Sequence, residues 1–424
     1  MDKNSIKTGD FIVILKNKEK WEGKVVQVFE NLVTLKLNSG YNVGIKIDEG
    51  TKIKKLWEEK VKKHRPVKFE LKFSKSKPSV SVLAAGGTIA SSIDYRTGAI
   101  SASYSASQLI ASIPELVNFA NIKSRKILEE MSENLTPKHW KKIGREVFRE
   151  LKESEGIVLT HGTDTLSYTS SMLSFMLRNL NKPVVLTFAQ KSSDRGSSDA
   201  SMNVICSTIT ATKNIAEVVV VGHGTISDDY CLINRGNKVR KMHSSQRNSF
   251  RPINCFPIGK VWPDGKVEFL DKYKKKEEVK EDCYLDDKIE EKVAIIKFYP
   301  GLDSEIVDFY VDKGYKGIVI EGTGLGHTAK DMFSKIKRAI ESGIIVVMTT
   351  QTIYGRVNPY VYSSAREISK LGVIYLEDLL TETAYTKLMW VLGHTQNEKE
   401  VRELMLKNLA GEFNKRLQPT QFLY

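Results

Sequence analysis

Beyond residue 78, short apolar runs alternate along the chain with segments whose apolar residues recur at helical spacing. Residues 80–84, 156–160, 183–188 and 217–221 are apolar runs of the length of buried strands. The segments between them carry apolar residues three and four positions apart, which predicts helices. Strands separated by helices form a parallel sheet with helices on both faces. We therefore predict a doubly wound α/β domain in which the polar loops after the strands share one edge.

Helix boundaries in this domain follow from start signals and spacing. Thr136 followed by Pro137 is typical of an N-cap with proline at the first helical position. The helix that begins there should bury Trp140, Ile143, Val147, Phe148 and Leu151. Further helices are predicted over residues 166–178 and about 201–213, and helical spacing also occurs over 109–117.

Two polar stretches interrupt this alternation. Residues 91–107 are rich in Ser, Tyr and Gly, bury little, and are predicted to form a mobile loop over a site. Residues 190–200 form a second polar loop.

A second α/β unit is predicted near the carboxyl end. It follows residues 272–292, which are dense in both charge signs and are typical of a solvated connection. Its strands are predicted at 293–298, 317–321 and 344–349, and its helices at 304–313, 329–342 and 382–392. The domains beyond the first 77 residues are therefore expected to cover 78–270 and 293–424, joined by a linker over 271–292.

The first 77 residues follow a different pattern. Between Gly9 and Leu56, four or five short alternating runs are separated by turn-like residues, which predicts a small all-β module, an SH3-like or Sm-like barrel. A Lys-rich linker follows over residues 58–77, with Pro66 inside it and Pro78 directly after it. Residues 1–77 hold 19 Lys and Arg against 10 Asp and Glu, so +9 of the formal net charge of +14 lies here. This favours contact with a polyanion, and a merely solvated surface is the alternative.

Composition narrows the protein class. Hydrophobic residues make up 41% and charged residues 27%, as in ordinary soluble proteins, and no apolar run is long enough to cross a bilayer. The amino terminus lacks the apolar core of a secretory signal. The four cysteines are far apart in sequence, which argues against a zinc site and a disulfide framework, and we expect no metal site. A cytoplasmic location is expected.

Candidate chemistry follows the first two strands of the α/β domain. Gly86 and Gly87 end the first strand just before Thr88, and Thr163-Asp164 come directly after the second. Loops at the carboxyl ends of parallel strands are where open α/β sheets keep their sites. A threonine hydroxyl needs a nearby base or cation to act as a nucleophile, and a desolvated lysine can serve. Spacing alone does not decide which lysine this is.

Two motifs carry a resemblance to a known family. AAGGTIA at 84–90 and THGTDT at 160–165 resemble the two signatures of the bacterial-type L-asparaginase and glutaminase family. The match continues through NRGNKVRKMHSSQRNSF at 234–250 and covers about 80–424. The resemblance implies a larger amino-terminal α/β domain and a smaller carboxyl-terminal one.

The resemblance also implies site residues. Thr88 falls on the nucleophile that attacks the side-chain amide, and Thr163, Asp164 and Lys241 fall on the supporting catalytic set. The family's mobile tyrosine falls on Tyr104 or Tyr95.

The same family grips the α-amino and α-carboxyl groups of its substrate at two positions that fall here on Ser132 and Glu133. Glu133 departs from the glutamine common there in asparaginases, so the preference between asparagine and glutamine stays open.

The amino-terminal module and the loops DYRTGAIS (94–101) and QKSSDRGSSDA (190–200) are similar to the archaeal family of glutamyl-tRNA(Gln) amidotransferase D subunits. That family implies a glutaminase subunit that binds no cofactor. Its ammonia passes to a partner, the amidotransferase E subunit, which uses ATP with Mg to convert Glu-tRNA(Gln) to Gln-tRNA(Gln), in a tetramer of two D and two E chains. A free-standing L-asparaginase and a non-enzymatic docking subunit are the rival interpretations.

Overall fold

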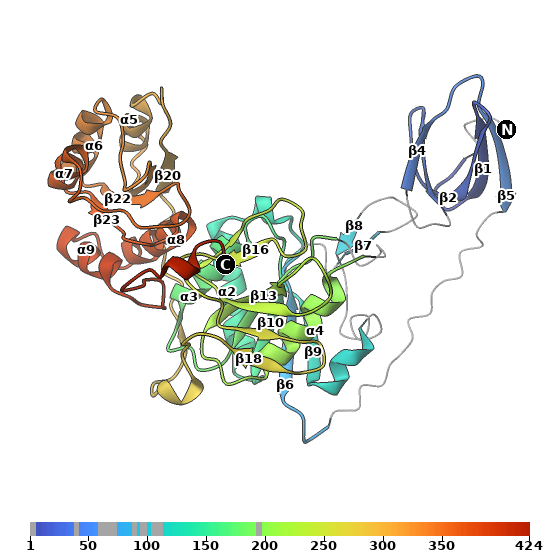
Figure 1. Ribbon diagram of the computed structural model, residues 1–424, viewed down its shortest axis with the longest axis horizontal. Coiled ribbons are helices and arrows are strands. Elements are labelled where there is room, and N and C mark those ends of the chain that lie inside the picture. The colour runs from blue at the N-terminus through green and yellow to red at the C-terminus, as the bar shows by residue number, and fades with distance from the viewer. Residues whose placement is uncertain are drawn as a thin grey trace.

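The computed structural model describes residues 6–37, 42–57, 74–86, 91–93, 100–102, 113–191 and 197–424. Within these ranges the chain folds into three principal sheets, drawn in Figure 1 from blue at the amino terminus to red at the carboxyl terminus. Among the described residues, no helix is long and apolar enough to cross a membrane.

The amino-terminal sheet is all antiparallel, with the order β4-β3-β2-β1-β5. Its strands are β1 (Phe11–Lys16), β2 (Glu19–Phe29), β3 (Leu32–Leu37), β4 (Asn42–Lys46) and β5 (Lys52–Trp57). Alternate side chains such as Ile12, Ile14 and Val25 are fully buried in a core that belongs to this sheet. The predicted all-β module is thus confirmed. A closed barrel is not, because no pairing between the edge strands β4 and β5 occurs among the residues described.

The central sheet has the order β18-β17-β14-β13-β12-β10-β6-β9. Its strands are β6 (Ser79–Ala84), β9 (Asn121–Lys126), β10 (Gly156–Thr160), β12 (Val184–Thr187), β13 (Val218–His223), β14 (Cys231–Arg235), β17 (Gly259–Val261) and β18 (Val267–Phe269). The run from β9 to β13 is parallel, which confirms the predicted strands, and β14, β17 and β18 extend it antiparallel. Strand β9 escaped prediction because it buries only Ile122 among its six residues.

Helices cover both faces of this sheet. They are α2 (Pro137–Leu151), α3 (Leu166–Met176) and α4 (Ala200–Ala211). Along β6, Val82 packs in the cluster that includes α4, and its neighbour Leu83 packs in the cluster that includes α2 and α3, as the alternation of side chains in a strand requires. The predicted start of α2 is confirmed by a capping box between Thr136 and His139.

The carboxyl-terminal sheet is parallel, with the order β20-β21-β22-β23. Its strands are β20 (Val293–Lys297), β21 (Gly317–Gly322), β22 (Ile345–Thr350) and β23 (Ile374–Tyr375), and its helices are α5 (Glu305–Asp312), α6 (Met332–Glu341), α7 (Ser363–Lys370), α8 (Thr381–Leu392) and α9 (Glu398–Leu406). The three predicted strands and three predicted helices are present, whereas β23, α7 and α9 were not anticipated.

The two α/β units pack together through α3 and α8, which lie side by side in Figure 1. The charged connection is more structured than expected: its short strand β19 (Tyr284–Leu285) pairs with β11 (Leu177–Arg178), the two residues that the sequence assigned to the end of a helix. Two fully buried ion pairs anchor the carboxyl-terminal segment, Lys238 with Asp378 and Lys387 with Glu412.

Shorter elements complete the chain. The stretch predicted as a loop over 91–107 contains a two-stranded ribbon. Of the segment at 109–117, residues 114–117 lie in a 3-10 turn, and residues 109–112 lie outside the described residues. These elements are β7 (Ser91–Ile93), β8 (Ile100–Ala102), β15 (Val239–Lys241), β16 (Phe250–Pro252) and the 3-10 turns η3 (Pro114–Asn118), η4 (Ser132–Asn134), η5 (Lys276–Glu278) and η6 (Pro419–Gln421).

Candidate active site

The candidate site lies where the winding of the central sheet reverses. From β6 the chain passes to β9 on one side, and it then returns to β10 on the other side of β6. Such a switch point leaves a crevice at the carboxyl ends of the strands. Ala84 of β6 is in register with Thr160 of β10, and the Ala85 amide donates to the Thr160 carbonyl at 3.0 Å. The segments that follow the two strands therefore leave the sheet at one edge.

Three turns meet at this edge in close contact. Gly86 has a φ of +96°, and a Cβ there would collide with the carbonyl oxygen of Glu130. A Cβ on Gly162 would lie 2.7 Å from the Cβ of Ser132. The Thr165 hydroxyl donates to the Ser132 carbonyl at 2.7 Å. Glycine is thus required at both positions, and the turns after β6, β9 and β10 are held as one unit.

Lys241 reaches this unit from β15. Its ammonium nitrogen donates to Thr163 Oγ1 at 2.8 Å and to Asp164 Oδ1 at 2.7 Å. The Lys241 side chain is 14% exposed, whereas that of Asp164 is 66% exposed. Strand β15 is held by pairing with β16, in which Lys241 lies opposite the buried Phe250. Residues 78 positions apart in the chain are therefore joined in one hydrogen-bonded set that contains a hydroxyl, a carboxylate and an amine.

Ser132 and Glu133, the predicted substrate-binding pair, lie in the turn η4 beside this set. Ser132 is buried at 4% exposure, and the Glu133 carboxylate is exposed to solvent. The structure therefore brings Thr163, Asp164 and Lys241 into contact and places Ser132 against the same turn. Thr88, Tyr104 and Tyr95 lie outside the described residues.

His161 is a structural residue despite its place beside Thr163. Its Nδ1 lies 2.7 Å from the Gly162 carbonyl, and its Nε2 lies 2.9 Å from the Thr169 hydroxyl. Trp140 Nε1 donates to that same hydroxyl, which leaves the hydroxyl proton for His161 Nε2. Complete burial lowers the pKa of His161 to about 4, so the ring is neutral near pH 7. The ring thus supports the turn and is poorly placed to serve as a base.

Arg240 and Glu382 form a second charged contact next to Lys241, which the sequence reasoning missed. Arg240 Nη1 lies 3.1 Å from Glu382 Oε1, in the first turn of α8. Burial raises the pKa of the Glu382 carboxyl, and Arg240 opposes that shift. Its second oxygen, Oε2, is buried without a hydrogen-bond partner among the described residues. The only available signal was an acidic residue at the start of a predicted helix, which is an ordinary feature of helices.

Two α/β domains of this topology, with a threonine, an aspartate and a lysine joined at the switch point, define a protein of the asparaginase and glutaminase class. The family models agree. "Asparaginase, N-terminal" matches residues 79–275, and "Glutaminase/Asparaginase C-terminal domain" matches 292–405. "GatD N-terminal domain" matches residues 6–56, a module outside the two α/β domains.

Full-length relatives refine this assignment. The D subunit of glutamyl-tRNA(Gln) amidotransferase from Pyrococcus furiosus is 50% identical over 100% of this chain and 98% of its own length. The corresponding protein of Pyrococcus abyssi is 52% identical over 97% of this chain and 96% of its own length. The chain therefore belongs to the family of glutamyl-tRNA(Gln) amidotransferase D subunits.

Solved structures resemble the two α/β domains. The thermostable L-asparaginase from Thermococcus kodakarensis is 34% identical, with a TM-score of 0.71 over 80% of this chain and 100% of that one. L-asparaginase I from Vibrio cholerae is 26% identical, with a TM-score of 0.70 over the same shares. Both matches leave a fifth of this chain uncovered, whereas the amidotransferase relatives cover nearly all of it.

Proposed function

We propose that this chain is the glutamine-hydrolysing subunit of an amidotransferase that converts Glu-tRNA(Gln) to Gln-tRNA(Gln). The observation that carries the chemistry is the contact of Lys241 with both Thr163 and Asp164 at the sheet's switch point. The family assignment supports the choice of an amidotransferase subunit over a free-standing L-asparaginase, because the full-length relatives share the amino-terminal module.

Thr88 is the nucleophile in this proposal. Its hydroxyl oxygen bonds to the side-chain carbonyl carbon of glutamine, and the hydroxyl proton passes to the Thr163, Asp164 and Lys241 set. The tetrahedral intermediate then breaks its carbon–nitrogen bond, and the amide nitrogen takes up a proton and leaves as ammonia. Water attacks the remaining ester, which releases glutamate and restores the threonine.

Lys241 is suited to move protons because it touches two different acceptors. In the resting arrangement its ammonium donates to Thr163 and to Asp164. When the ammonium gives one proton to the amide nitrogen that leaves as ammonia, the neutral amine becomes an acceptor for the proton of the Thr163 hydroxyl. The Asp164 carboxylate orients the lysine throughout, at the exposed end of the set.

Substrate binding falls to Ser132, Glu133 and Tyr104. The exposed carboxylate of Glu133 is suited to pair with the α-ammonium of the substrate, and Ser132 lies in the same turn. Tyr104, or Tyr95 in its place, covers the bound substrate.

Partner and context belong to the same proposal. Ammonia passes to the amidotransferase E subunit in an assembly of two D and two E chains. That partner binds ATP with Mg and the tRNA, whereas this chain binds no cofactor and no metal. We further propose a cytoplasmic location, an SH3-like barrel for the amino-terminal module, and domain boundaries at 1–77, 78–270, 271–292 and 293–424.

A transfer experiment tests the function. The purified chain is mixed with the E subunit, Glu-tRNA(Gln), ATP, Mg and glutamine labelled with 15N in its side chain. We expect the label in Gln-tRNA(Gln), and we expect its loss with Thr88→Ala. Rapid asparagine hydrolysis by the chain alone, with no label in tRNA, would instead establish the free-standing asparaginase.

A further inference from the structure

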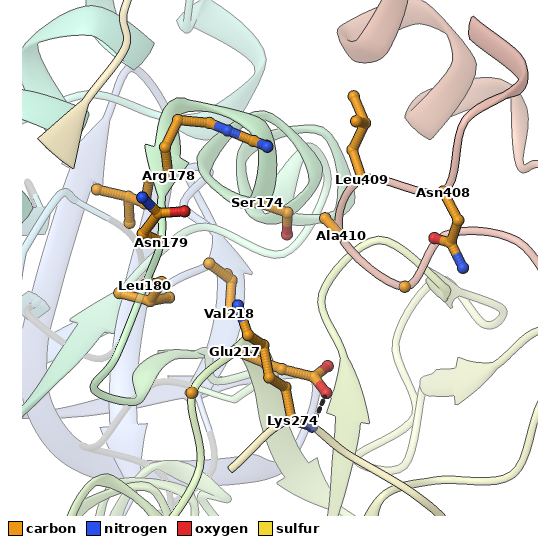
Figure 2. A pocket seen from close by; sticks show the side chains of 13 residues that line it. Ser174, Arg178, Asn179, Leu180, Glu217, Val218, Lys274, Asn408, Leu409 and Ala410 are labelled. Atoms are coloured by element: carbon orange, nitrogen blue, oxygen red, sulfur yellow. Dashed lines mark hydrogen bonds between the residues drawn. The ribbon is translucent and has the colours of Figure 1, made fainter. Parts of the chain in front are cut away.

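A cavity of about 410 Å³ lies between the two α/β domains, away from the candidate active site. Its walls come from the carboxyl end of α3, the residues that lead into β13, Lys274 of the connection, and the turn after α9 (Figure 2). This volume is within the range of small-molecule sites. The structure therefore offers a second concave site of usable size at the domain seam.

The cavity and the Thr163-Asp164 turn lie at opposite ends of one helix. Helix α3 begins at Leu166, directly after that turn, and it ends at Met176 beside the cavity. A helix of this length spans roughly 16 Å. Val218, the first residue of β13, also lines the cavity, whereas the active-site turns follow the last residues of the parallel strands. A ligand here would not compete with glutamine.

Two cations line the cavity without a pairing partner. The half-buried guanidinium of Arg178 lies over the Trp390 ring at 5.3 Å and has neither a hydrogen bond nor an ion pair within the described ranges. The Lys274 ammonium is likewise unpaired in the part of the chain that the structure describes. In Figure 2, Arg178 and Lys274 come from opposite sides of the cavity. A half-buried guanidinium that has no protein partner for its donors is available to bind an anion.

The acidic residue in the wall, Glu217, does not cancel these charges. Its carboxylate accepts from Arg235 Nε at 2.6 Å and Nη2 at 3.1 Å, and from the Lys274 backbone amide at 2.7 Å. Glu217 is therefore already neutralised by Arg235, and its ion pair raises the pKa of that guanidinium. Gly411 packs against the same arginine, where a Cβ would lie 2.9 Å from Arg235 Nε. The charge of Glu217 is thus balanced by Arg235, and the remaining charges that line the cavity, those of Arg178 and Lys274, are positive.

We propose that this cavity binds a small dicarboxylate, with one carboxylate on the Arg178 guanidinium and the other on the Lys274 ammonium. The planar fork of arginine matches a carboxylate in two parallel hydrogen bonds. Lys274 is exposed at the mouth and closes the other end as a point charge. The Asn179 side chain donates to Glu281 and so keeps its amide nitrogen away from the ligand. This inference does not rest on the proposed function, because binding is measured without glutamine.

Calorimetric titration of the full-length chain with succinate tests the proposal, with acetate and inorganic phosphate as comparison anions at equal ionic strength. We expect saturable binding of succinate and at least about tenfold weaker binding of acetate, because acetate reaches only one cation. Arg178→Gln and Lys274→Gln should each weaken succinate binding about tenfold or more, and the exposed Lys399→Gln should leave it unchanged.

Three results would overturn the proposal. They are the absence of saturable succinate binding up to about 10 mM, equal affinity for acetate or phosphate, and unchanged affinity in Lys274→Gln. The last variant is informative even if Arg178→Gln folds poorly after losing its stack on Trp390, since Lys274 is exposed and its side chain has no partner to lose in the described ranges.

Discussion

Arg240 and Glu382 form an ion pair, 3.1 Å between Nη1 and Oε1, that joins the strand carrying Lys241 to the carboxyl-terminal domain. Arg240 directly precedes Lys241, and Glu382 lies in the first turn of α8. Because α8 also packs on α3, the helix that follows the Thr163-Asp164 turn, one element of the second domain supports both halves of the hydrogen-bonded set. The smaller domain thus has a direct structural link to the candidate chemistry.

Replacement of Glu382 should therefore affect catalysis from outside the site. Glu382→Gln keeps the shape but leaves Arg240 without its counter-charge, one residue from Lys241. We expect kcat/KM for glutamine to fall by about tenfold. The loss in the double variant Arg240→Gln/Glu382→Gln should differ from the sum of the losses in the two single variants, because the two residues are in contact. Steady-state hydrolysis of glutamine checks this. Strictly additive effects of the two single changes would contradict the coupling.

The same variant should change how stability depends on pH. Burial raises the pKa of Glu382 in the folded chain, so the folded state holds a proton that the unfolded state has released. Stability contributed by this group is present below the unfolded pKa of 4.5 and is lost as pH rises toward the folded pKa. We expect Glu382→Gln to remove this decrease of stability with rising pH. The free energy of unfolding in denaturant, measured at a series of pH values above 4.5, checks this.

Lys241 should be the most sensitive of the described site residues. Lys241→Gln removes the amine that touches both Thr163 and Asp164, and we expect glutamine hydrolysis to fall about a thousandfold with little change in stability. Asp164→Asn should cost less, because its carboxylate is 66% exposed and its charge is screened. Glutamate release measures both. The matched control is Lys399→Gln, and a Lys241→Gln enzyme within tenfold of the parent would reject the assignment.

His161 should govern stability in mildly acidic solution. Burial lowers its pKa from 6.5 to about 4, so between these values the unfolded chain binds a proton that the folded chain does not. Stability should then fall as pH drops from 6.5 toward 4, by about 3 kcal/mol in all at 1.36 kcal/mol per pKa unit. Denaturant unfolding of the parent and of His161→Gln measures this slope. An equal slope in both proteins would show that other groups cause it.

Removing one partner of the buried pair Lys387 and Glu412 should destabilise the fold more than replacing both partners with apolar residues. Lys387 Nζ lies 2.7 Å from Glu412 Oε1, and it also donates to the Met405 and Lys407 carbonyls. Lys387→Met alone leaves a buried carboxylate unpaired and should lower the free energy of unfolding by about 3–5 kcal/mol. The double variant Lys387→Met/Glu412→Leu should lose less than the single one. Equal losses would mean that the backbone contacts of Lys387 dominate.

Local regularity explains which elements the sequence predicts well. Strand β10 begins and ends as expected, since all five of its residues are buried in a parallel sheet and the apolar run is uninterrupted. Helix α2 was predicted from Thr136 and Pro137, which act on the backbone next to them. Strand β9 was missed because it buries one residue of six, and its place in the sheet comes from pairing with β6, a partner about 40 residues earlier. The end of α3 was overestimated because Leu177 and Arg178 pair with β19 instead.

The chain's pattern by itself determined the α/β class, the separate all-β module and the turns that carry Thr163 and Asp164, because strand length, helix spacing and turn chemistry are properties of neighbouring residues. The contact of Lys241 with those two residues was decided only by tertiary structure. It depends on the pairing of β15 with β16 and on the order of strands in the sheet, and hydrogen bonds between residues 77 and 78 positions apart leave no periodic trace in the sequence. The ion pair of Arg240 with Glu382 has the same origin, since it forms only when the two α/β domains pack against each other.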